Sequence, residues 1–436
     1  MVFLNSRMYS KIIKKINSKS IKVGIIGLGY VGLPLMCLIA KKKIETFGFD
    51  TNLKKINYLK NKKSYISDLS NNELKILNSK NLFDKKNFSN ISKVDLIILC
   101  LPTPLKKNLK PDMRIIQNCF NQIKKFLRKD QVLILESTVY PGATEDLFLK
   151  FIKKKFNIGK DFFLCYSPER INPGVKGKIK YENTTKVISG YTENCKKIVK
   201  KFYDIFFSKT HLTKNIKIAE ISKLYENTYR AVNIGLVNQI KMITDKININ
   251  IYDVINASAT KPFGFTKFVP GPGMGGHCIP IDPLFLSWIA KKNQSDARFI
   301  DLARKVNLNV LKWTTRKIFN FTKKKKIKRI LLIGMAYKKN INDDRESPCK
   351  KIFSFFYSKK FNVRFYDPLV KKTRINNKDF YSLKSLNITD VKKYDVIIIG
   401  TDHDIFNYKM ILKHSKYIFD TRGVFSKYDL QKIIHC

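Results

Sequence analysis

IKVGIIGLGYVGLPLMCLIA, residues 21–40, contains the strongest fold signal in the chain. It begins with a short apolar strand, Val23–Ile26, and continues through a turn with the spacing G-x-G-x-x-G into an apolar helix. The glycines of this turn, Gly27, Gly29 and Gly32, allow a tight turn, the approach of a pyrophosphate to the backbone, and close packing of helix on strand. The N–H groups at the helix N-terminus favour phosphate. The stretch therefore predicts a Rossmann-like, doubly wound α/β domain.

A second strand ends at Asp50 in the stretch TFGFD. An acidic residue about 20 positions after the glycines is where such a domain holds the ribose hydroxyls of NAD. The Asp50 carboxylate would repel the 2′-phosphate of NADP, so we expect NAD as the cofactor. A glycine turn without a ligand is the alternative.

Three further apolar runs, VDLIILCLPTP, QVLILESTVYPG and FFLCYSPERINPG, have the character of buried parallel strands. Each ends in a polar turn that contains proline. Ligands of a doubly wound sheet sit beyond the carboxyl ends of its strands. We therefore expect the polar residues of these turns at the ligand edge, although each alone could be a turn residue or a helix cap: Thr103, Glu136, Ser137, Thr138 and Glu169.

Residues 215–246 have apolar side chains at helical spacing and no proline. Lys223, Asn227 and Arg230 then lie on one face of the predicted helix, as functional groups or as a solvated stripe.

The loop GPGMGGHCIPIDP, residues 271–283, is stiffened by glycine and proline and looks built to present Cys278 or Asp282. The helix that starts at Asp282 would stabilise the thiolate of Cys278. The simpler roles are a small buried residue for Cys278 and a helix N-cap for Asp282. We interpret His277 as part of the loop structure.

The last third contains four more apolar strands, in KRILLIGMAY, NVRFYDP, YDVIIIGTDH and YIFDTRG. They predict a second, partial doubly wound unit, and because GMAY lacks the glycine spacing we expect no second dinucleotide site. The segment AYKKNINDDRESP follows the first of these strands and places Lys338, Lys339 and Arg345 at the ligand edge. Arginine suits bidentate phosphate binding and lysine acts as a point charge, but Lys339 could equally be solvated.

The chain of 436 residues carries a formal net charge of +51. The lysines are spread along the chain and no nucleic-acid-binding module is visible, so we expect anionic small substrates and no nucleic acid partner. Eight cysteines are scattered without a C-x-x-C pair, which argues against a metal site and for the reducing cytoplasm. No apolar run is long enough to predict membrane insertion. Residues 1–20 form a basic extension, for which disorder, a start at Met8 or a transit peptide are alternatives.

An ordered set of motifs resembles the UDP-glucose/GDP-mannose dehydrogenase family from about Ile21 to the end: GIIGLGYVGLPL, ESTVYPGATE, YSPERINPG, ISKLYENTYRAVNI, GPGMGGHCIPIDP and AYKKNINDDRESP. Within the family, KPFGF, GGHCIPIDP and FIDLARKVN look most like UDP-N-acetylglucosamine 6-dehydrogenases. The resemblance implies an NAD-binding domain (21–212), a central helical dimerisation region with the Cys278 loop (213–312) and a Rossmann-like UDP-sugar-binding domain (313–436). It also implies a cytoplasmic homodimer or higher homo-oligomer in surface polysaccharide or O-antigen synthesis.

The same resemblance implies a four-electron oxidation of a sugar CH2OH to a carboxylate. Lys223 and Asn227 would stabilise the oxyanion, and Cys278 would form a thiohemiacetal and then a thioester. Thr138 and Asp282 would order the hydrolytic water, with Glu169 in acid/base work. The implied cofactor contacts are Gly27, Gly29, Tyr30, Val31, Gly32, Asp50, Thr103 and Thr138. The implied substrate contacts are Arg170, Lys223, Asn227, Arg230, Gly275, Lys338 and Arg345, and no metal is needed.

Two positions depart from the family pattern. Pro173 stands where UDP-glucose enzymes carry a second glutamate, which favours an N-acetylhexosamine substrate. Asn340 replaces a commoner aspartate and would affect loop anchoring rather than chemistry. No residue reports the epimer, so UDP-N-acetylgalactosamine, UDP-N-acetylmannosamine and UDP-glucose remain alternatives. A two-electron NAD reductase and a basic polyanion-binding protein are the competing functions.

Overall fold

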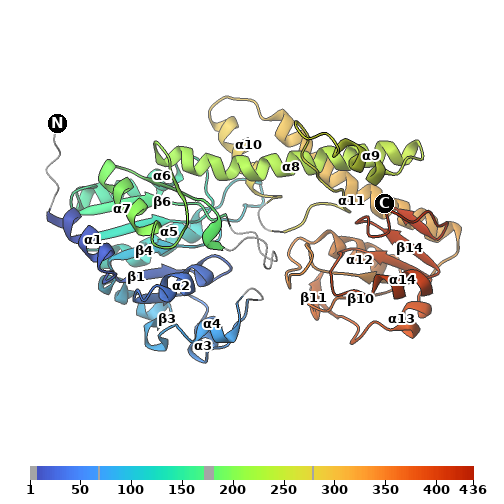
Figure 1. Ribbon diagram of the computed structural model, residues 1–436, viewed down its shortest axis with the longest axis horizontal. Coiled ribbons are helices and arrows are strands. Elements are labelled where there is room, and N and C mark those ends of the chain that lie inside the picture. Colours follow the sequence, from blue (N-terminus) through green and yellow to red (C-terminus); the bar gives the residue numbers. More distant parts are fainter. Residues whose placement is uncertain (1–6, 67–68, 171–180, 277–278) are drawn as a thin grey trace. The chain divides into compact units, whose positions relative to one another are not determined.

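The computed structural model describes residues 7–66, 69–170, 181–276 and 279–436. The chain divides into two compact units. The first unit comprises Met1–Glu226 and Leu284–Ser295, and the second comprises Asn227–Pro283 and Asp296–Cys436. Figure 1 follows the chain through both units.

The first unit is built on a sheet whose strands, in the described part of the chain, have the order β3-β2-β1-β4-β5-β6-β7-β8. Neighbouring strands are parallel except β6 and β7, which are antiparallel. The order reverses between β1 and β4, which is the point where doubly wound sheets bind ligands. The strands are β1 (Val23–Ile26), β2 (Thr46–Phe49), β3 (Leu82–Phe83), β4 (Leu96–Leu99), β5 (Gln131–Leu135), β6 (Phe162–Tyr166), β7 (Lys186–Gly190) and β8 (Thr210–Leu212).

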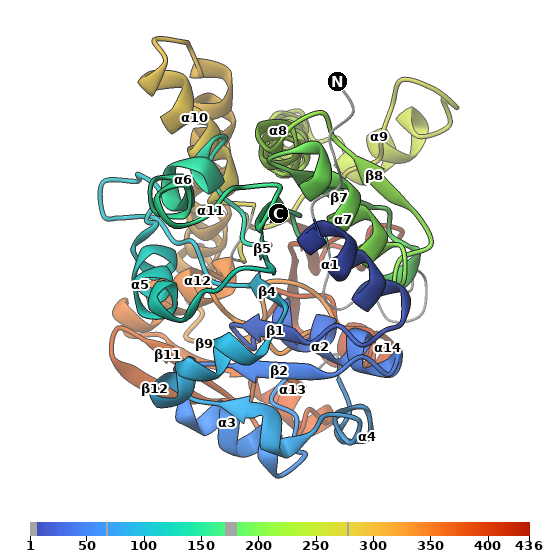
Figure 2. The same ribbon diagram turned by 90° about the vertical axis from the view of Figure 1, so that its left-hand side faces the viewer.

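Helices cover both faces of this sheet (Figure 2). Alternate strand residues, such as Ile25 and Ile98, pack in one core with α1, α2, α3 and α7. Helices α5 and α6 lie on the other face, where the rings of Phe120 and Phe148 are 4.8 Å apart. The helices are α1 (Arg7–Asn17), α2 (Gly32–Lys41), α3 (Leu53–Lys60), α4 (Asn71–Leu74), α5 (Arg114–Ile123), α6 (Ala143–Lys155) and α7 (Glu193–Tyr203), with short 3-10 helices at Ser79–Asn81, Lys85–Lys93, Lys124–Phe126 and Tyr181–Asn183.

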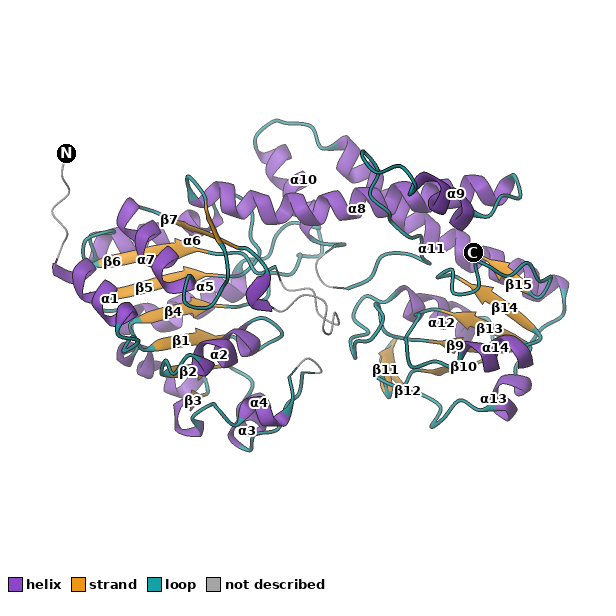
Figure 3. Ribbon diagram, viewed as in Figure 1, coloured by secondary structure: helices purple, strands orange, loops and turns teal. Residues whose placement is uncertain are grey.

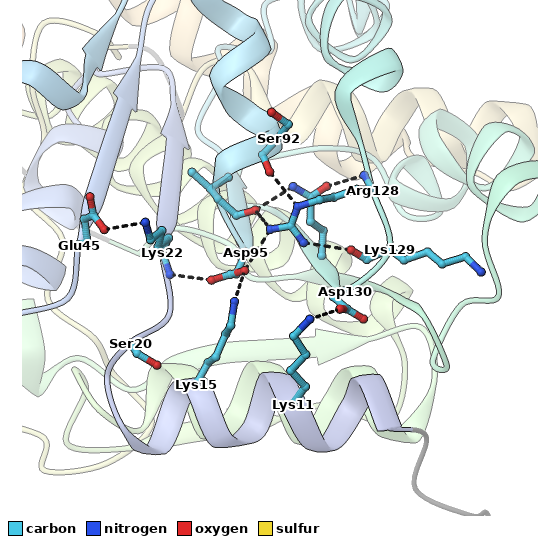
Figure 4. Close-up of polar contacts among 12 residues, drawn as sticks. Lys11, Lys15, Ser20, Lys22, Glu45, Ser92, Asp95, Arg128, Lys129 and Asp130 are labelled. Carbon is cyan, nitrogen blue, oxygen red and sulfur yellow. Dashed lines mark hydrogen bonds and ion pairs between the residues drawn. The ribbon is translucent and has the colours of Figure 1, made fainter.

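Helix α1 contradicts the alternative that the basic extension is disordered over residues 7–17. Its apolar residues Ile12 and Ile16 are one turn apart and buried in the core of the first unit. Its lysines reach polar groups at the amino ends of the strands, and Lys15 Nζ lies 2.7 Å from the buried Asp95 Oδ1 (Figure 4). Charge alone suggested a solvated segment, whereas the i, i+4 spacing of two isoleucines decides that this helix packs.

The second unit contains another parallel sheet, with the order β10-β9-β13-β14-β15 in the described residues (Figure 3). These strands are β9 (Arg329–Ile333), β10 (Asn362–Tyr366), β13 (Val396–Ile399), β14 (Tyr417–Asp420) and β15 (Ile433–His435), and β11 (Lys372–Ile375) pairs with β12 (Lys378–Tyr381) as an antiparallel hairpin. Helix α12 (Pro348–Ser358) packs on one face, and α13 (Ile388–Lys393) and α14 (Tyr408–His414) pack on the other. The predicted second doubly wound unit is confirmed.

The central part of the chain is helical, as the apolar spacing predicted. It comprises α8 (Ile216–Lys246), α9 (Ile251–Ser258), α10 (Asp282–Lys292) and α11 (Arg298–Lys324). The division between the two units falls within α8, after Glu226. Across the described ranges, no helix combines the length and the apolar character that a membrane span requires.

Candidate active site

The three glycines of the first turn have different surroundings. A Cβ on Gly27 or Gly32 would come within 3.0 Å of a backbone oxygen, and Gly27 has a φ of +96°. A Cβ on Gly29 would meet no described heavy atom within 4 Å. Helix α2 follows Val31 without a side-chain cap from the described residues. Gly27 and Gly32 are thus required by packing, while Gly29 and the open helix N-terminus fit an anionic group such as a pyrophosphate.

Asp50 is held rigidly at the end of β2. Its Oδ2 accepts hydrogen bonds from the Leu28 N–H and the Lys55 ammonium, both at 3.0 Å, and its Oδ1 accepts one from the Asn52 N–H at 2.8 Å. A carboxylate has about four acceptor positions, so this arrangement leaves capacity for a ribose hydroxyl. Sequence reasoning did not single out Lys55, and a lysine five residues after Asp50 carried no distinctive signal.

The turns that follow β4 and β5 are joined to each other. The Thr103 hydroxyl donates to the Thr138 carbonyl at 2.7 Å, and the Leu101 N–H donates to the Ser137 hydroxyl at 2.9 Å. Thr103 and Ser137 are buried, and Thr138 is partly exposed. Neighbouring parallel strands end at the same edge of a sheet, and the predicted residues Thr103 and Thr138 lie side by side for that reason.

A buried ionic cluster lies beside these turns. The Lys186 ammonium is 3.1 Å from Glu136 Oε2 and 3.2 Å from Glu169 Oε2, and the Tyr203 hydroxyl donates to Glu136 Oε1. The Lys186 side chain is 2% exposed, that of Glu136 is 0% exposed and that of Glu169 is 9% exposed. Glu136 and Glu169 were expected at this edge, whereas Lys186 was missed because a single lysine before an apolar run has no distinctive pattern.

The electrostatics of the cluster follow from burial and charge. Burial raises the pKa of Glu136, and the nearby Lys186 opposes this only in part. Burial by itself would lower the pKa of Lys186, but the charges of Glu136 and Glu169 outweigh it and the pKa is raised. Lys186 is therefore a permanent cation at neutral pH. Burial, and then Glu136, raise the pKa of Tyr203, which stays a hydrogen-bond donor.

Arg170, a predicted substrate contact, is bound within the first unit. Its guanidinium lies 2.8 Å from Glu226 Oε1 and donates to the Thr185 carbonyl at 2.9 Å. Its backbone N–H donates to Glu169 Oε1 at 2.6 Å. These contacts hold the turn after β6 in place up to the last residue described there.

In the second unit, Asn227 of α8 contacts the first residue of α10. Asn227 Nδ2 donates to Asp282 Oδ2 at 2.5 Å, and both side chains are buried. Lys223 is one helical turn before Asn227 and is half-buried, whereas Arg230 is exposed. The predicted helix face is therefore not only a solvated stripe, because Asn227 on this face makes a buried hydrogen bond to Asp282.

The glycine-rich loop packs on the segment after β9. A Cβ on Gly275 would lie 2.8 Å from Tyr337 Cβ and 2.9 Å from the Glu346 carbonyl oxygen. The Gly276 N–H donates to the Arg345 carbonyl at 3.2 Å, and Gly276 has a φ of +87°. Glycine is needed here for close packing as well as for backbone freedom. Cys278 and His277, which follow directly, lie outside the described residues, as does Pro173.

The basic segment after β9 is held by its own acidic neighbours. The Arg345 guanidinium pairs with Asp343, with an Nη2–Oδ2 distance of 2.6 Å, and the Lys339 ammonium lies 2.9 Å from Asp404 Oδ1. Asn340 Nδ2 donates to Asp404 Oδ2 at 2.6 Å. The ion pair of Lys339 lies at the surface, which agrees with the prediction that Lys339 could be a solvated side chain. An aspartate at position 340 would place its carboxylate against that of Asp404. Lys338 is half-buried.

Glu220 is a buried acid that sequence reasoning missed. It accepts hydrogen bonds from the Gly142 N–H at 2.5 Å and from the Thr144 N–H at 2.9 Å, and so caps the N-terminus of α6. Burial raises its pKa to about 7, although these hydrogen bonds oppose the shift. The helix N-terminus and its cap are far apart in sequence, so no local capping motif was available to predict it.

Three family models cover most of the chain. The NAD binding domain of the UDP-glucose/GDP-mannose dehydrogenase family matches residues 21–207, its central domain matches 217–309, and its UDP binding domain matches 331–427. The chain belongs to this family. The glycine turn, Asp50 and the second unit are therefore parts of an NAD-dependent UDP-sugar dehydrogenase.

Several proteins similar to this chain are named as dehydrogenases of UDP-linked N-acetylated sugars. A UDP-N-acetyl-D-mannosamine dehydrogenase of Methanocaldococcus jannaschii is 33% identical, with 93% of each chain covered. A UDP-N-acetyl-D-glucosamine 6-dehydrogenase of Pseudomonas aeruginosa is also 33% identical and covers 89% of this chain and 92% of its own. The solved UDP-D-ManNAc dehydrogenase of Pyrococcus horikoshii is 28% identical, with a TM-score of 0.82 over 95% of this chain and 99% of that one.

Proposed function

We propose that the protein is an NAD-dependent UDP-N-acetylhexosamine 6-dehydrogenase. The observation that carries the proposal is the buried hydrogen bond from Asn227 to Asp282. This hydrogen bond fixes Asp282, four residues after Cys278, to the side-chain amide of Asn227 on α8. The same chain has an NAD-binding domain. A two-electron reductase would not need the thiol of Cys278.

The overall reaction converts one CH2OH, two NAD+ and one water into one carboxylate, two NADH and three H+. NAD, when bound, accepts the hydride in each of the two oxidations. In our proposal Lys223 and Asn227 stabilise negative charge on the C6 oxygen, and Asn227 can do so because its amide has a second N–H. Lys338 and Arg345 contribute positive charge for the UDP moiety.

The thiol of Cys278 adds to the aldehyde carbon after the first oxidation, and the second oxidation leaves a thioester. Hydrolysis then forms a C–O bond from water, breaks the C–S bond and returns the thiol. We propose that Thr138 and Asp282 orient this water and that Glu169 takes its proton. The fixed environments of Asp282 and Glu169 suit such roles because both carboxylates are buried and hydrogen-bonded.

The sugar is proposed as UDP-N-acetylglucosamine from the sequence motifs. UDP-N-acetylmannosamine is the second candidate because relatives at similar identity have that name. We also propose a homo-oligomer in the cytoplasm. Large apolar side chains remain exposed on the helical part of the second unit, which favours an interface there: Leu236, Ile243, Phe299 and Leu302.

The test is the number of NADH formed per sugar consumed, with UDP-N-acetylglucosamine, UDP-N-acetylmannosamine, UDP-N-acetylgalactosamine and UDP-glucose. We expect two NADH per N-acetylhexosamine and little from UDP-glucose. Cys278→Ser should lose the second oxidation. One NADH per sugar in the wild type would overturn the thioester route, and none from any sugar would overturn the enzyme assignment.

A further inference from the structure

The ionic cluster of Glu136, Glu169 and Lys186 contains two groups that the proposed mechanism does not use. Of the three, only Glu169 has a proposed chemical role. Burying a lysine costs free energy unless anionic partners compensate. Lys186 has two such partners in contact with one ammonium. Its position therefore needs an explanation in terms of what it does for Glu169.

The antiparallel pairing of β7 with β6 places Lys186 at the ligand edge. The register pairs Cys165 with Gly190 and Tyr166 with Ser189. If this register is continued for three residues past the end of β6, Glu169 stands directly opposite Lys186. A parallel β7 would have put its first residue at the other edge of the sheet. The reversal of one strand thus brings a cation to the carboxyl ends of the others.

The other carboxylate fixes the cation rather than competing for substrate. Glu136 is fully buried, its Oε1 accepts from Tyr203 and its Oε2 accepts from Lys186. Burial, followed by the charge of Glu136, raises the pKa of the Cys100 thiol well above the usual value, so Cys100 adds no charge to the cluster. Glu169 is the member with some exposed surface.

We propose that Lys186 is a positioning residue for Glu169, and that Glu136 and Tyr203 hold Lys186 in place. The ammonium favours the ionised form of the Glu169 carboxylate and fixes its Oε2, as the Arg170 N–H fixes its Oε1. The inference rests on the proposed function, because it matters for catalysis only if Glu169 takes the proton from the hydrolytic water.

The experiment measures kcat against pH for Lys186→Met, Lys186→Arg, Glu136→Gln and the double variant Lys186→Met/Glu136→Gln. The double variant removes a cation and its buried partner together, which preserves folding better than removal of one charge. With Lys186 replaced by methionine, the acid limb of kcat should move to higher pH by about 1–3 units, the effect of losing an opposite charge at this distance. Because slower hydrolysis of an accumulated thioester lowers kcat and KM together, kcat/KM for NAD and for the UDP-sugar should stay unchanged.

A second readout follows the thioester. When hydrolysis becomes the slow step, a burst of two NADH per active site should precede a slow steady state. Lys186→Arg keeps the charge and should restore most of the pH profile, and Glu136→Gln should leave the acid limb near or below its wild-type position. Lys15→Met is the matched control, because Lys15 also pairs with a buried carboxylate, Asp95, but at the amino ends of the strands.

The outcomes separate the two claims. The inference is supported if the acid limb is higher in Lys186→Met than in the wild type, is higher in the double variant than in Glu136→Gln, and is unchanged in Lys15→Met. A folded double variant whose acid limb coincides with that of Glu136→Gln, and which shows no burst, overturns the role of Lys186 while leaving the dehydrogenase assignment intact. A wild-type protein that forms no NADH overturns the proposed function, and the inference with it.

Discussion

Gly29→Ala adds one methyl group to the glycine turn at a point where the protein leaves room for it. No described heavy atom lies within 4 Å of the added Cβ, and Gly29 is absent from the glycines with positive φ. Alanine can therefore adopt the native backbone. At such positions the substitution leaves the free energy of unfolding unchanged or raises it by about 0.4–1 kcal/mol.

The cost should appear when NAD binds. If the glycine turn binds NAD as its spacing predicts, the methyl group would occupy the space through which the pyrophosphate reaches the backbone at the α2 N-terminus. Displacing one charge-assisted hydrogen bond costs about 1.5–3 kcal/mol, which corresponds to a rise of roughly 10- to 150-fold in the Kd for NAD. Calorimetric titration with NAD measures the Kd, and thermal unfolding of the free protein measures stability.

Gly32→Ala is the matched control within the same turn. Its Cβ would lie within 3.0 Å of the Gly27 carbonyl oxygen, so the variant should lose about 1–3 kcal/mol of stability through overpacking. The reasoning is refuted if Gly29→Ala binds NAD as tightly as the wild type, or if it destabilises the free protein as much as Gly32→Ala does.

Three further predictions concern stability and the loop. The pKa of the Glu220 carboxyl is about 7 in the folded state and 4.5 for the ordinary group. The free energy of unfolding of the wild type should therefore fall by about 3 kcal/mol as pH rises from 4.5 to 7. Urea titrations at several pH values should show that Glu220→Gln lacks this fall. Gly276→Ala should lower kcat more than it raises KM for NAD. The reason is that the new Cβ would come 2.6 Å from the Tyr337 ring and displace the loop before Cys278. An unchanged kcat in steady-state kinetics would contradict this prediction. Asn340→Asp should lower the melting temperature at low salt, with the difference vanishing at high salt, because it faces Asp404; a difference that persists in high salt would point to a steric cause.

Local patterns in the sequence predicted much of the fold. The strand before Gly27 has the expected bounds, the expected apolar helix begins at Gly32, and the strands of the last third form a second parallel sheet. The reason is that buried parallel strands are short apolar runs whose ends carry glycine, proline or polar residues. The same reasoning placed Thr103 and Thr138 together, because strand ends that share an edge are neighbours.

The sequence could not show how distant segments pair. Whether the basic helix α1 packs depended on Ile12 and Ile16 reaching the core of the first unit, and basic composition argued the other way. The cap that Glu220 gives to α6 joins residues more than 70 positions apart, beyond the range of any capping pattern. Asn340 acquires a meaning only beside Asp404.

Local patterns were therefore enough to predict the two α/β units, the dinucleotide turn and the glycine requirement of the loop before Cys278, because each depends on residues close together in the chain. The tertiary structure decided the direction of β7 and, through it, the contact of Lys186 with Glu136 and Glu169. Strand direction is set by how the whole sheet packs, and reversing one strand moves its first residue to the opposite edge. A lysine with no local signal becomes the buried cation of the candidate site for that reason.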